Sequence, residues 1–413
     1  MKIAAYIAKK VHLGGSEKKS TPAVKIATIG VALGVATMIV ALAIVVGFKN
    51  QVSEKAIGFS SHVRITGITD QLTTNSTPIA VSDSICNSLN SSTEVLSIGK
   101  CVEQSAVLKT DNDFCGIILK GIDKEYDNAF FREALVDGNM PVFSDSLPSK
   151  NILLSSRIAS KLQLNVGGSV LCYFIKDDKV KVRKFNVSGI YNTNFAEYDT
   201  YYALCDLRVL QSVNNWNADQ YTTLEIKLKD FDNLQNFTSD LRYSIIGDTD
   251  AYGVSYFVES ALDINPQLFN WLELLDMNVW IIIVLMSLVA GFTIISGVLI
   301  IILEKTAMIG TLKALGATDK TIRQTFLHLS SYLIAKGLIW GNIVGLGLCA
   351  IQYYFGVLKL DAETYYISEV PIEFNWWLLI LLNIGSILIL LVMVTIPTYI
   401  ISKIKPAETI RFE

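Results

Sequence analysis

Charged residues are scarce in this sequence, and most of the shortfall falls in four segments. Asp, Glu, Lys and Arg make up 18% of the 413 residues, against roughly 25% in a typical soluble domain. Each segment is long enough to cross a bilayer, which takes about 20 residues; the segments are 24–48, 278–303, 332–355 and 376–401. Buried helices of soluble proteins rarely run so long without charge. The composition therefore argues against one large soluble protein and predicts four transmembrane helices.

The motifs of several enzyme classes are also missing. No GxxxxGK[ST] loop is present, although P-loop ATPases bind phosphate with this motif; residues 316–321 resemble one but lack its spacing. No HExxH motif, Ser/His/Asp arrangement or catalytic carboxylate pair is found, and His12, His62 and His328 are far apart. We therefore expect no catalytic, cofactor-binding or metal-binding residue in this chain, and no nucleic-acid partner.

Cysteines show no metal-site or redox spacing. Five of the six lie between the first two hydrophobic segments, and no CxxC pair occurs among Cys86, Cys101, Cys115, Cys172 and Cys205. Cys101 and Cys115 could bridge a hairpin, but spacing alone does not decide this. We favour buried free thiols.

Lysine and arginine are distributed asymmetrically about the predicted spans. The first 25 residues carry six lysines and one acid, and residues 304–325 carry four bases and two acids. By contrast, residues 48–276 hold 29 acids and 20 bases, and residues 356–375 are acidic. The positive-inside rule then places both termini and residues 304–325 in the cytoplasm, and the large domain outside. The first span is too long for a signal peptide and lacks a cleavage site, so we expect it to be retained.

The chain then divides into nine parts. Ile3, Tyr6, Ile7 and Val11 have helical spacing with lysines opposite, which predicts a helix on the membrane surface or a frayed terminus. The predicted parts are a cytoplasmic interfacial helix (1–23), span 1 (24–48), a periplasmic domain (49–277), span 2 (278–303), a cytoplasmic coupling helix and loop (304–331), span 3 (332–355), a periplasmic loop (356–375), span 4 (376–401) and a cytoplasmic tail (402–413).

The periplasmic domain has the patterns of an α/β fold. Alternating and β-branched stretches predict strands at 62–68, 115–122, 169–175, 180–191 and 221–229. Helical periodicity appears at 151–164 and 231–245, and residues 174–182 predict a hairpin with a tight polar tip. Because strands lie at both ends of the domain and a β-rich block lies between them, we expect a porter-like part (49–110 and 206–276) and a β-rich insert (111–205).

Glycines recur at four-residue intervals in the first and third spans. The first span has the pair Gly30 and Gly34, and the third has the triplet Gly337, Gly341 and Gly345. Small residues one turn apart let membrane helices approach closely. We expect these five positions to pack helices together.

Residues 304–317, EKTAMIGTLKALGA, follow directly on the second span. Met308, Leu312 and Leu315 have i, i+4, i+7 spacing, so they could fill a groove on a cytosolic partner, with Lys305 and Lys313 beside it. A packed interfacial loop without a partner is the alternative. The predicted coupling residues are Glu304, Lys305, Met308, Ile309, Leu312, Lys313, Leu315 and Gly316.

Several segments resemble one family along nearly the whole chain. Residues 29–48, 55–67, 265–318, 360–374 and 403–413 are similar, in order, to the permease subunits of the FtsX-like ABC transporter superfamily. The coupling segment carries the resemblance to the superfamily. The segment LDAETYYISEVPIEF (360–374) resembles the lipoprotein-releasing LolC/LolE-type branch.

The resemblance implies the MacB-like, type VII ABC permease architecture. Two permease chains, identical or different, would bind a dimer of a separate ATPase that holds ATP and Mg. The pair would take a lipoprotein from the inner membrane and pass it to a periplasmic carrier. In the family the outer ends of the first two spans line the substrate cavity, which here would be Ile44, Val45, Phe48, Leu275, Val279 and Ile282; each could equally face lipid.

The hairpin at 174–184 looks short and charged beside the hairpin with which one family subunit captures the carrier. Carrier docking on this chain is therefore open. Two other functions are also open: a MacB-like exporter of peptides, toxins or drugs, which usually has a fused N-terminal ATPase domain, and an FtsX-like regulator of a periplasmic hydrolase, whose external domain is typically smaller. A plain membrane anchor would leave residues 304–317 unexplained.

Overall fold

The computed structural model describes residues 22–68, 77–143, 148–176 and 179–400. The interfacial helix expected at 1–23 lies almost wholly outside these residues, and the tail expected at 402–413 lies entirely outside them. The chain forms two compact units. Unit 1 comprises Met1–Asn50, Trp271–Lys359 and Glu369–Glu413, and unit 2 comprises Gln51–Asn270 and Leu360–Ser368.

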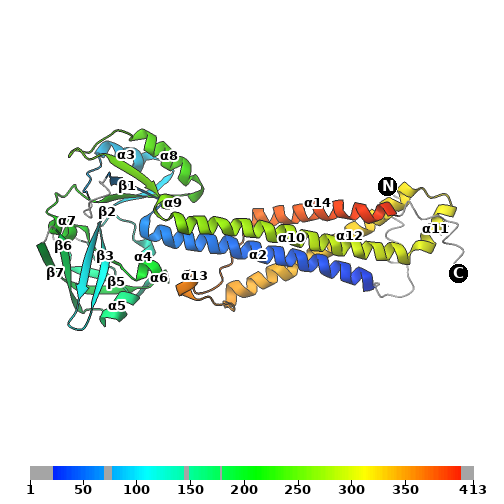
Figure 1. Ribbon diagram of the computed structural model, residues 1–413, viewed down its shortest axis with the longest axis horizontal. Coiled ribbons are helices and arrows are strands. Elements are labelled where there is room, and N and C mark those ends of the chain that lie inside the picture. Colours follow the sequence, from blue (N-terminus) through cyan, green and yellow to red (C-terminus); the bar gives the residue numbers. More distant parts are fainter. Residues whose placement is uncertain (1–21, 69–76, 144–147, 177–178, 401–413) are drawn as a thin grey trace. The chain divides into compact units, whose positions relative to one another are not determined.

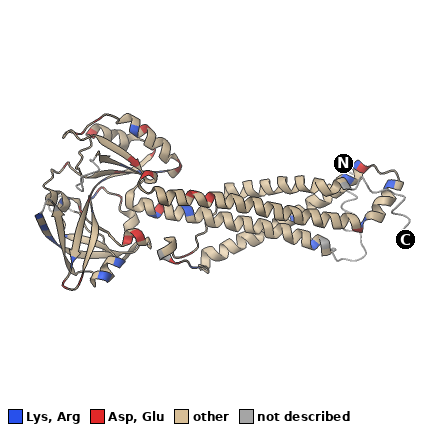
Figure 2. Cartoon of the chain, in the orientation of Figure 1, with Lys and Arg blue, Asp and Glu red and all other residues tan. Residues whose placement is uncertain are grey.

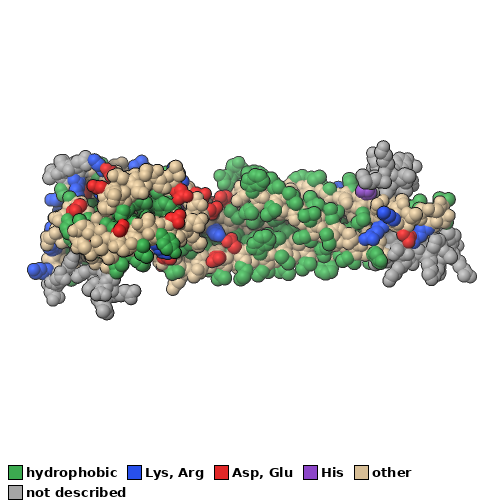
Figure 3. Space-filling view, turned by 90° about the horizontal axis from the view of Figure 1, so that it is seen from above, with side chains coloured by type: hydrophobic (Ala, Val, Ile, Leu, Met, Phe, Trp, Pro, Cys, Tyr) green, Lys and Arg blue, Asp and Glu red, His purple; other side chains and the backbone are tan. Residues whose placement is uncertain are grey.

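Four long helices are apolar and long enough to cross a membrane (Figure 1). They are α2 (Pro22–Ser60), α10 (Pro266–Glu304), α12 (Asp319–Phe355) and α14 (Trp376–Ile400). Figure 2 shows almost no charge along their middle parts, and Figure 3 shows hydrophobic side chains covering the face of the helices seen there.

Three of these helices are longer than the expected spans. Each of α2 and α10 has 39 residues, about 58 Å at 1.5 Å per residue, whereas the apolar part of a bilayer is about 30 Å thick. The end of an apolar run therefore does not end the helix: α2 continues through Lys49, Glu54 and Lys55. The coupling helix and loop expected at 304–331 correspond to α11 (Thr306–Ala314), a short turn and the first part of α12, which already begins at Asp319.

Within unit 1, α2 packs closely against α10 and α12. A methyl group added at Gly34 would lie 3.1 Å from Cβ of Ala290 on α10, and one added at Gly30 would overlap Thr293 of the same helix. Both glycines thus lie where α2 meets α10.

The glycine triplet of α12 packs against α2 as well. Added methyl groups would lie 2.7 Å from Cγ1 of Val31 for Gly337, 2.8 Å from Cβ of Val35 for Gly341, and 3.1 Å from Cα of Ala36 for Gly345. All three neighbours belong to α2. The bundle core of unit 1 therefore forms around α2, with Val31, Val35 and Ile39 wholly buried.

Unit 2 contains a ten-stranded mixed sheet (Figure 1). Its strands are β1 (Val63–Gly67), β2 (Val95–Lys109), β3 (Phe114–Ile122), β4 (Leu135–Gly138), β5 (Asn151–Ser155), β6 (Ser169–Lys176), β7 (Lys179–Tyr191), β8 (Tyr202–Asp206), β9 (Thr223–Leu228) and β10 (Tyr256–Ser260). The order is β10-β1-β9-β2-β3-β8-β5-β7-β4, and β6 pairs with β2 and β7.

Short helices connect these strands. They are α3 (Asp83–Ser91), α4 (Ala129–Glu133), α5 (Ser156–Leu162), α6 (Ala196–Asp199), α7 (Leu207–Asn214), the 3-10 turn η1 (Phe231–Asn233), α8 (Leu234–Ser244), α9 (Ala261–Ile264) and, from the later segment, α13 (Ala362–Tyr365).

The fifteen-residue strand β2 joins two halves of the sheet. Its first half, from Val95 to Cys101, pairs with β9, and its second half, from Cys101 to Lys109, pairs with β3. Strands from both ends of the domain therefore share one sheet with strands of its middle. The two expected parts, 49–110 with 206–276 and 111–205, are thus joined by the hydrogen bonds of a single strand.

One further expectation differs from the structure, and the favoured state of the cysteines agrees with it. The helix expected at 151–164 begins as β5, an apolar strand whose residues from Ile152 to Ser155 are buried, and only Ser156–Leu162 is helical. All six cysteines are free. Cys101 lies opposite Ile122 and Cys115 opposite Leu108, so Cys101 and Cys115 are too far apart along the ladder to form a disulfide.

Candidate functional site

The predicted coupling segment forms a helix-turn-helix at one end of the membrane helices. Gly316 has φ of +91°, in the left-handed region that glycine adopts without strain, and this ends α11. Two residues later the Thr318 hydroxyl accepts a hydrogen bond from the Thr321 N–H and caps α12, so local chemistry fixes both helix ends.

The predicted coupling residues do not form a single free surface. Ile309 is fully buried and Leu312 packs partly against the bundle core, whereas Leu315 is 80% exposed. Hydrophobic spacing alone cannot tell a core-facing ridge from a partner-facing one, which is why the predicted set contains both.

The exposed surface of α11 consists of small residues and one leucine. Ala307, Thr311, Ala314 and Leu315 are exposed, and the first three have i, i+4, i+7 spacing. We call these four residues the α11 outer face. Of these four residues, the sequence analysis predicted only Leu315, although the i, i+4, i+7 spacing of the other three is visible in the sequence.

An ion pair closes the turn beside this face. Nζ of Lys313 lies 2.9 Å from Oδ1 of Asp319 at the start of α12, and the Lys313 side chain is only 10% exposed. Lys313 therefore stabilises the helix-turn-helix, and its charge is already partnered within the chain.

The six predicted cavity residues divide by burial. Phe48 and Val279 are 8% and 5% exposed, and the ring of Phe48 packs edge-on against Trp271 at 5.6 Å. These two are packed by the chain itself. The other four, Ile44, Val45, Leu275 and Ile282, are partly or fully exposed.

The described residues of unit 1 also hold a shallow groove elsewhere on α2 and α10. It has a volume of about 300 Å³ and is lined by Ile26, Phe292, Thr293, Ser296, Gly297 and Ile300. None of the predicted cavity residues lines this groove. At the opposite end of the same two helices, Lys49 forms an ion pair with Asp276.

A second cluster, not anticipated from the sequence, surrounds the last turn of α2 in unit 2. The ring of Phe59 is 1% exposed and has six aromatic neighbours with centroids 4.7 to 6.5 Å away. We call these rings the Phe59 socket; they belong to Phe130, Phe131, Tyr191, Phe195, Tyr198 and Tyr202.

A buried lysine holds the backbone of the same turn. Lys120 on β3 donates from Nζ to the Phe59 carbonyl at 2.5 Å and to Glu225 at 2.6 Å, and the hydroxyl of Tyr126 donates to the other oxygen of Glu225 at 2.7 Å. Burial alone would lower the pKa of Lys120, but the Glu225 carboxylate raises it above its usual range. The lysine therefore stays charged inside the domain.

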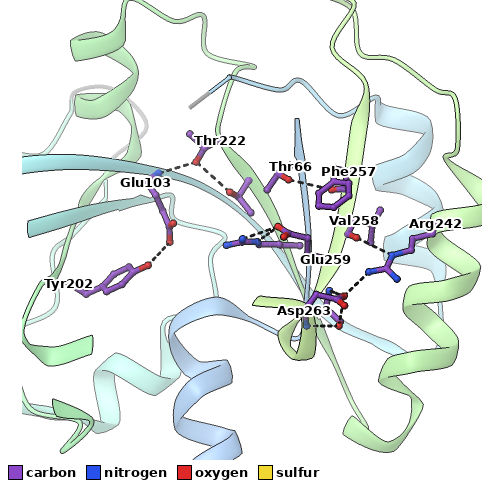
Figure 4. A network of polar contacts seen from close by, with 12 residues as sticks. Thr66, Glu103, Tyr202, Thr222, Arg242, Phe257, Val258, Glu259 and Asp263 are labelled. Atoms are coloured by element: carbon purple, nitrogen blue, oxygen red, sulfur yellow. Dashed lines mark hydrogen bonds and ion pairs between the residues drawn. The ribbon is translucent and has the colours of Figure 1, made fainter. Parts of the chain in front are cut away.

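Polar contacts continue across the neighbouring strands (Figure 4). Arg64 on β1 pairs with Glu259 on β10 at 2.8 Å, and the hydroxyl of Tyr202 on β8 donates to Glu103 on β2 at 3.4 Å. Burial raises the pKa of Glu103. The first contact joins strands from the two ends of the domain, and the second joins β2 to a strand of its middle.

Comparison with known families matches the two parts of the chain separately. Residues 26–243 match the MacB-like periplasmic core domain, and residues 280–406 match the FtsX-like permease C-terminal model. The first match covers more than half of the chain.

Curated relatives extend over nearly the full length. The chain is 23% identical over 405 residues to the lipoprotein-releasing system transmembrane protein LolC of Xylella fastidiosa, covering 93% of this chain and 92% of that protein. It is 22% identical over 409 residues to LolE of Haemophilus influenzae, covering 94% and 93%. Among solved structures, the periplasmic region of MacB from Actinobacillus actinomycetemcomitans is similar at a TM-score of 0.34 and 15% identity, covering 50% of this chain and 92% of that chain.

Proposed function

Since the chain belongs to the FtsX-like family of ABC transporter permeases with a MacB-like periplasmic core domain, we propose that it releases lipoproteins from the bacterial inner membrane. The observation that carries this proposal is the extent of the match. Similarity to lipoprotein-releasing proteins covers 93% of the chain and so includes the periplasmic domain as well as the membrane helices. A MacB-like exporter would share the periplasmic core domain as well, so it is the full-length likeness to proteins named as lipoprotein-releasing that favours this function.

The proposed work requires an energy source outside this chain. Each methylene of an acyl chain gains about 0.8 kcal/mol in lipid, so extracting a multiply acylated anchor costs far more than thermal energy provides. We assign that energy to a dimer of a separate ATPase, which binds ATP and Mg, acting on a pair of permease chains. The lipoprotein would leave the membrane laterally.

We place the ATPase contact on the α11 outer face. Ala307, Thr311 and Ala314 let a partner approach closely, and Leu315 offers an exposed apolar anchor. The excess of lysine and arginine near both termini and near α11 supports a cytoplasmic location for this end. The periplasmic domain is then on the other side of the membrane, where the lipoprotein is delivered.

For the substrate we propose the exposed members of the predicted cavity set. Ile44, Val45, Leu275 and Ile282 retain free apolar surface, which suits an acyl chain, whereas Phe48 and Val279 support them from behind. A second permease chain would complete the cavity.

A carrier would dock on the β6–β7 hairpin under the same proposal. The two strands pair over eight rungs, which makes the hairpin longer than the 174–184 segment expected. Ile175 and Val180 lie opposite each other and are 65% and 58% exposed, an apolar pair without cover among the described residues of unit 2.

Depletion of the protein followed by membrane fractionation tests the function. We expect outer-membrane lipoproteins to accumulate in the inner membrane, and the wild-type gene supplied in trans to restore their sorting. Leu315→Asp should fail to restore it and should reduce the co-purifying ATPase by at least about tenfold, because a charge replaces a central apolar anchor. The amount of inserted permease should be unchanged.

A matched leucine controls for the charge itself. Leu96 on β2 is 55% exposed in the periplasmic domain, and Leu96→Asp should restore sorting fully. Normal lipoprotein sorting after depletion would refute the proposed function, and normal ATPase recovery with Leu315→Asp would refute the proposed contact.

A further inference from the structure

The last turn of α2 is held against the core of unit 2 both by the side chain of Phe59 and by the backbone of the turn. Phe59 fills its socket, and its carbonyl accepts a hydrogen bond from Lys120. Ser61 then leaves the helix with φ of +63°, and its hydroxyl donates to the Ile226 carbonyl on β9 at 2.8 Å. Because α2 is one uninterrupted helix from Pro22 to Ser60, its end is bonded to two central strands, β3 and β9.

The segment Leu360–Ser368 belongs to the same unit although it lies far away in the sequence. Tyr366 packs edge-on against Phe195, a member of the Phe59 socket, at a centroid distance of 4.8 Å. The Tyr366 carbonyl accepts a hydrogen bond from Nζ of Lys55 at 3.0 Å. Lys55 lies one helical turn before Phe59 on α2. Tyr366 thus contacts both the Phe59 socket and α2, the helix whose last turn the socket surrounds.

The conformation of Tyr366 shows that these contacts hold it in place. Its φ is +64°, a region that is uncommon for a bulky residue and persists only where the surroundings impose it. The segment is closed on itself by the Leu360 N–H donating to the Ser368 carbonyl at 2.9 Å, and Ile367 next to Tyr366 is 2% exposed. A loop that only connected two helices would not need a strained, anchored tyrosine.

We propose that Tyr366 is a positioning residue that fastens the α12–α14 connection to the end of α2, so that these membrane helices drive the periplasmic domain through one joint. The inference rests on the proposed function for its purpose, since it assigns the route by which ATP-driven movement reaches unit 2. It also accounts for the 360–374 segment, which the ATPase contact and the cavity leave without a role.

The test compares Tyr366→Ala with Tyr366→Phe in the full permease–ATPase complex in lipid nanodiscs. Tyr366→Phe keeps the ring against Phe195 and the carbonyl that accepts from Lys55, so it is the matched control. Substituting Lys120 would be less informative, because an unpaired buried Glu225 would threaten folding itself. Two quantities are measured: lipoprotein released per ATP hydrolysed, and the ATP-dependent change in amide hydrogen exchange of β8 and β9.

With Tyr366→Ala we expect an unchanged ATPase rate and a fall in release per ATP of about 2- to 10-fold, the equivalent of one aromatic pair. The ATP-dependent exchange change should shrink in parallel, and Tyr366→Phe should restore both quantities. Wild-type values for Tyr366→Ala would overturn the joint. So would an equal loss of ATPase and release at a constant ratio, which indicates a merely structural residue.

The exchange measurement separates failure of the joint from failure of the function. A wild-type complex that releases no lipoprotein, yet shows an exchange change that Tyr366→Ala loses, would support the joint and refute lipoprotein release. A wild-type complex with no ATP-dependent change in β8 and β9 would overturn the joint, whatever is released.

Discussion

Lys120 and Glu225 form an ion pair with almost no exposed surface, at 0% and 4% of their side chains. Burying two charges costs several kcal/mol per ion, and their attraction offsets this only with good geometry and further hydrogen bonds. Those bonds are present here, from Lys120 to the Phe59 carbonyl and from Tyr126 to Glu225. An apolar pair could fill the same volume, but it could not bond to the carbonyl at the end of α2.

His62 gives unit 2 a stability that depends on pH. Its Nδ1 accepts a hydrogen bond from the Leu228 N–H at 3.3 Å, so the neutral ring is the form that fits. Burial, with a smaller effect of Lys227, lowers the pKa of His62 from 6.5 to about 4. Above pH 6.5 the ring is neutral in both the folded and unfolded states. As the pH falls from 6.5 towards 4, the unfolded state takes up a proton first, and the folded state loses stability.

We therefore expect the wild-type protein to lose about 3 kcal/mol through His62 between pH 7 and pH 4, at 1.36 kcal/mol per pKa unit. His62→Asn supplies an amide oxygen that can accept the same hydrogen bond but does not titrate. Thermal unfolding of the purified protein between pH 7.5 and pH 4.5 is the measurement. The midpoint should fall more steeply in the wild type than in His62→Asn, and parallel pH profiles would contradict this role.

Sequence patterns predicted the secondary structure around some residues correctly, but not whether their side chains are buried. The strand at 115–122 was predicted, yet nothing in its alternation shows that Lys120 points into the core, because a lysine in an apolar strand is ordinarily solvated. Its partner Glu225 lies on a different strand 105 residues away. Only the folded sheet brings them together, so this buried ion pair could not be predicted from a single sequence.

At the scale of elements, α2 is the helix on which unit 1 depends, because α10 and α12 both contact it at glycines. The closest backbone approach is at Gly341, where an added methyl group would lie 2.9 Å from the Ala32 carbonyl oxygen. Backbone cannot move aside as a flexible side chain can, so Gly341→Ala should separate α2 from α12.

Gly341→Ala should cost about 1–3 kcal/mol, the usual price of overpacking, seen as a lower unfolding temperature in detergent. Gly347 on the same helix has no atom within 4 Å of an added methyl group, so Gly347→Ala should leave stability unchanged or raise it by up to about 1 kcal/mol through helix propensity. Both changes alter helix propensity equally, and their difference isolates packing. Equal stability of the two variants would show that α2 and α12 do not meet as described.

Element boundaries were harder to predict than element types. Four hydrophobic runs predicted four helices, and the described residues contain four, because apolar length is a strong and local signal. Apolar sequence marks only the part of a helix that lies within the bilayer. It therefore did not predict that α2 extends to Ser60 or that α12 starts at Asp319. Periodicity likewise found α11 but not which of its faces the bundle covers, which depends on residues of the other helices in the same core cluster.

At the scale of the whole molecule, the sequence predicted a membrane protein with a large α/β domain between its first two helices. What it could not predict was a single sheet through the domain, because β2 pairs with strands from both parts. Nor could it show that a segment near residue 366 belongs to the same unit as residues 51–270. Both are contacts at long sequence separation, which local patterns do not encode.

The orientation of the chain in the membrane gives the last prediction. The basic residues near α11 predict a cytoplasmic location, and Leu315 there is 80% exposed, whereas Phe114 on β3 is 66% exposed in the domain predicted to be periplasmic. Single cysteines are placed at these positions by Leu315→Cys and Phe114→Cys in a Cys86→Ser background, because Cys86 is the one native cysteine that is not buried.

A membrane-impermeant maleimide added to spheroplasts should label Phe114→Cys but leave Leu315→Cys unlabelled until the membrane is disrupted. The Cys86→Ser protein without an added cysteine is the control for background labelling. Since the buried thiols have no access to the reagent in the folded protein, any signal reports the side of the membrane on which the new cysteine lies. Labelling of Leu315→Cys in intact spheroplasts would place α11 outside, where no ATP-driven subunit could reach it, and would remove the coupling scheme along with the topology.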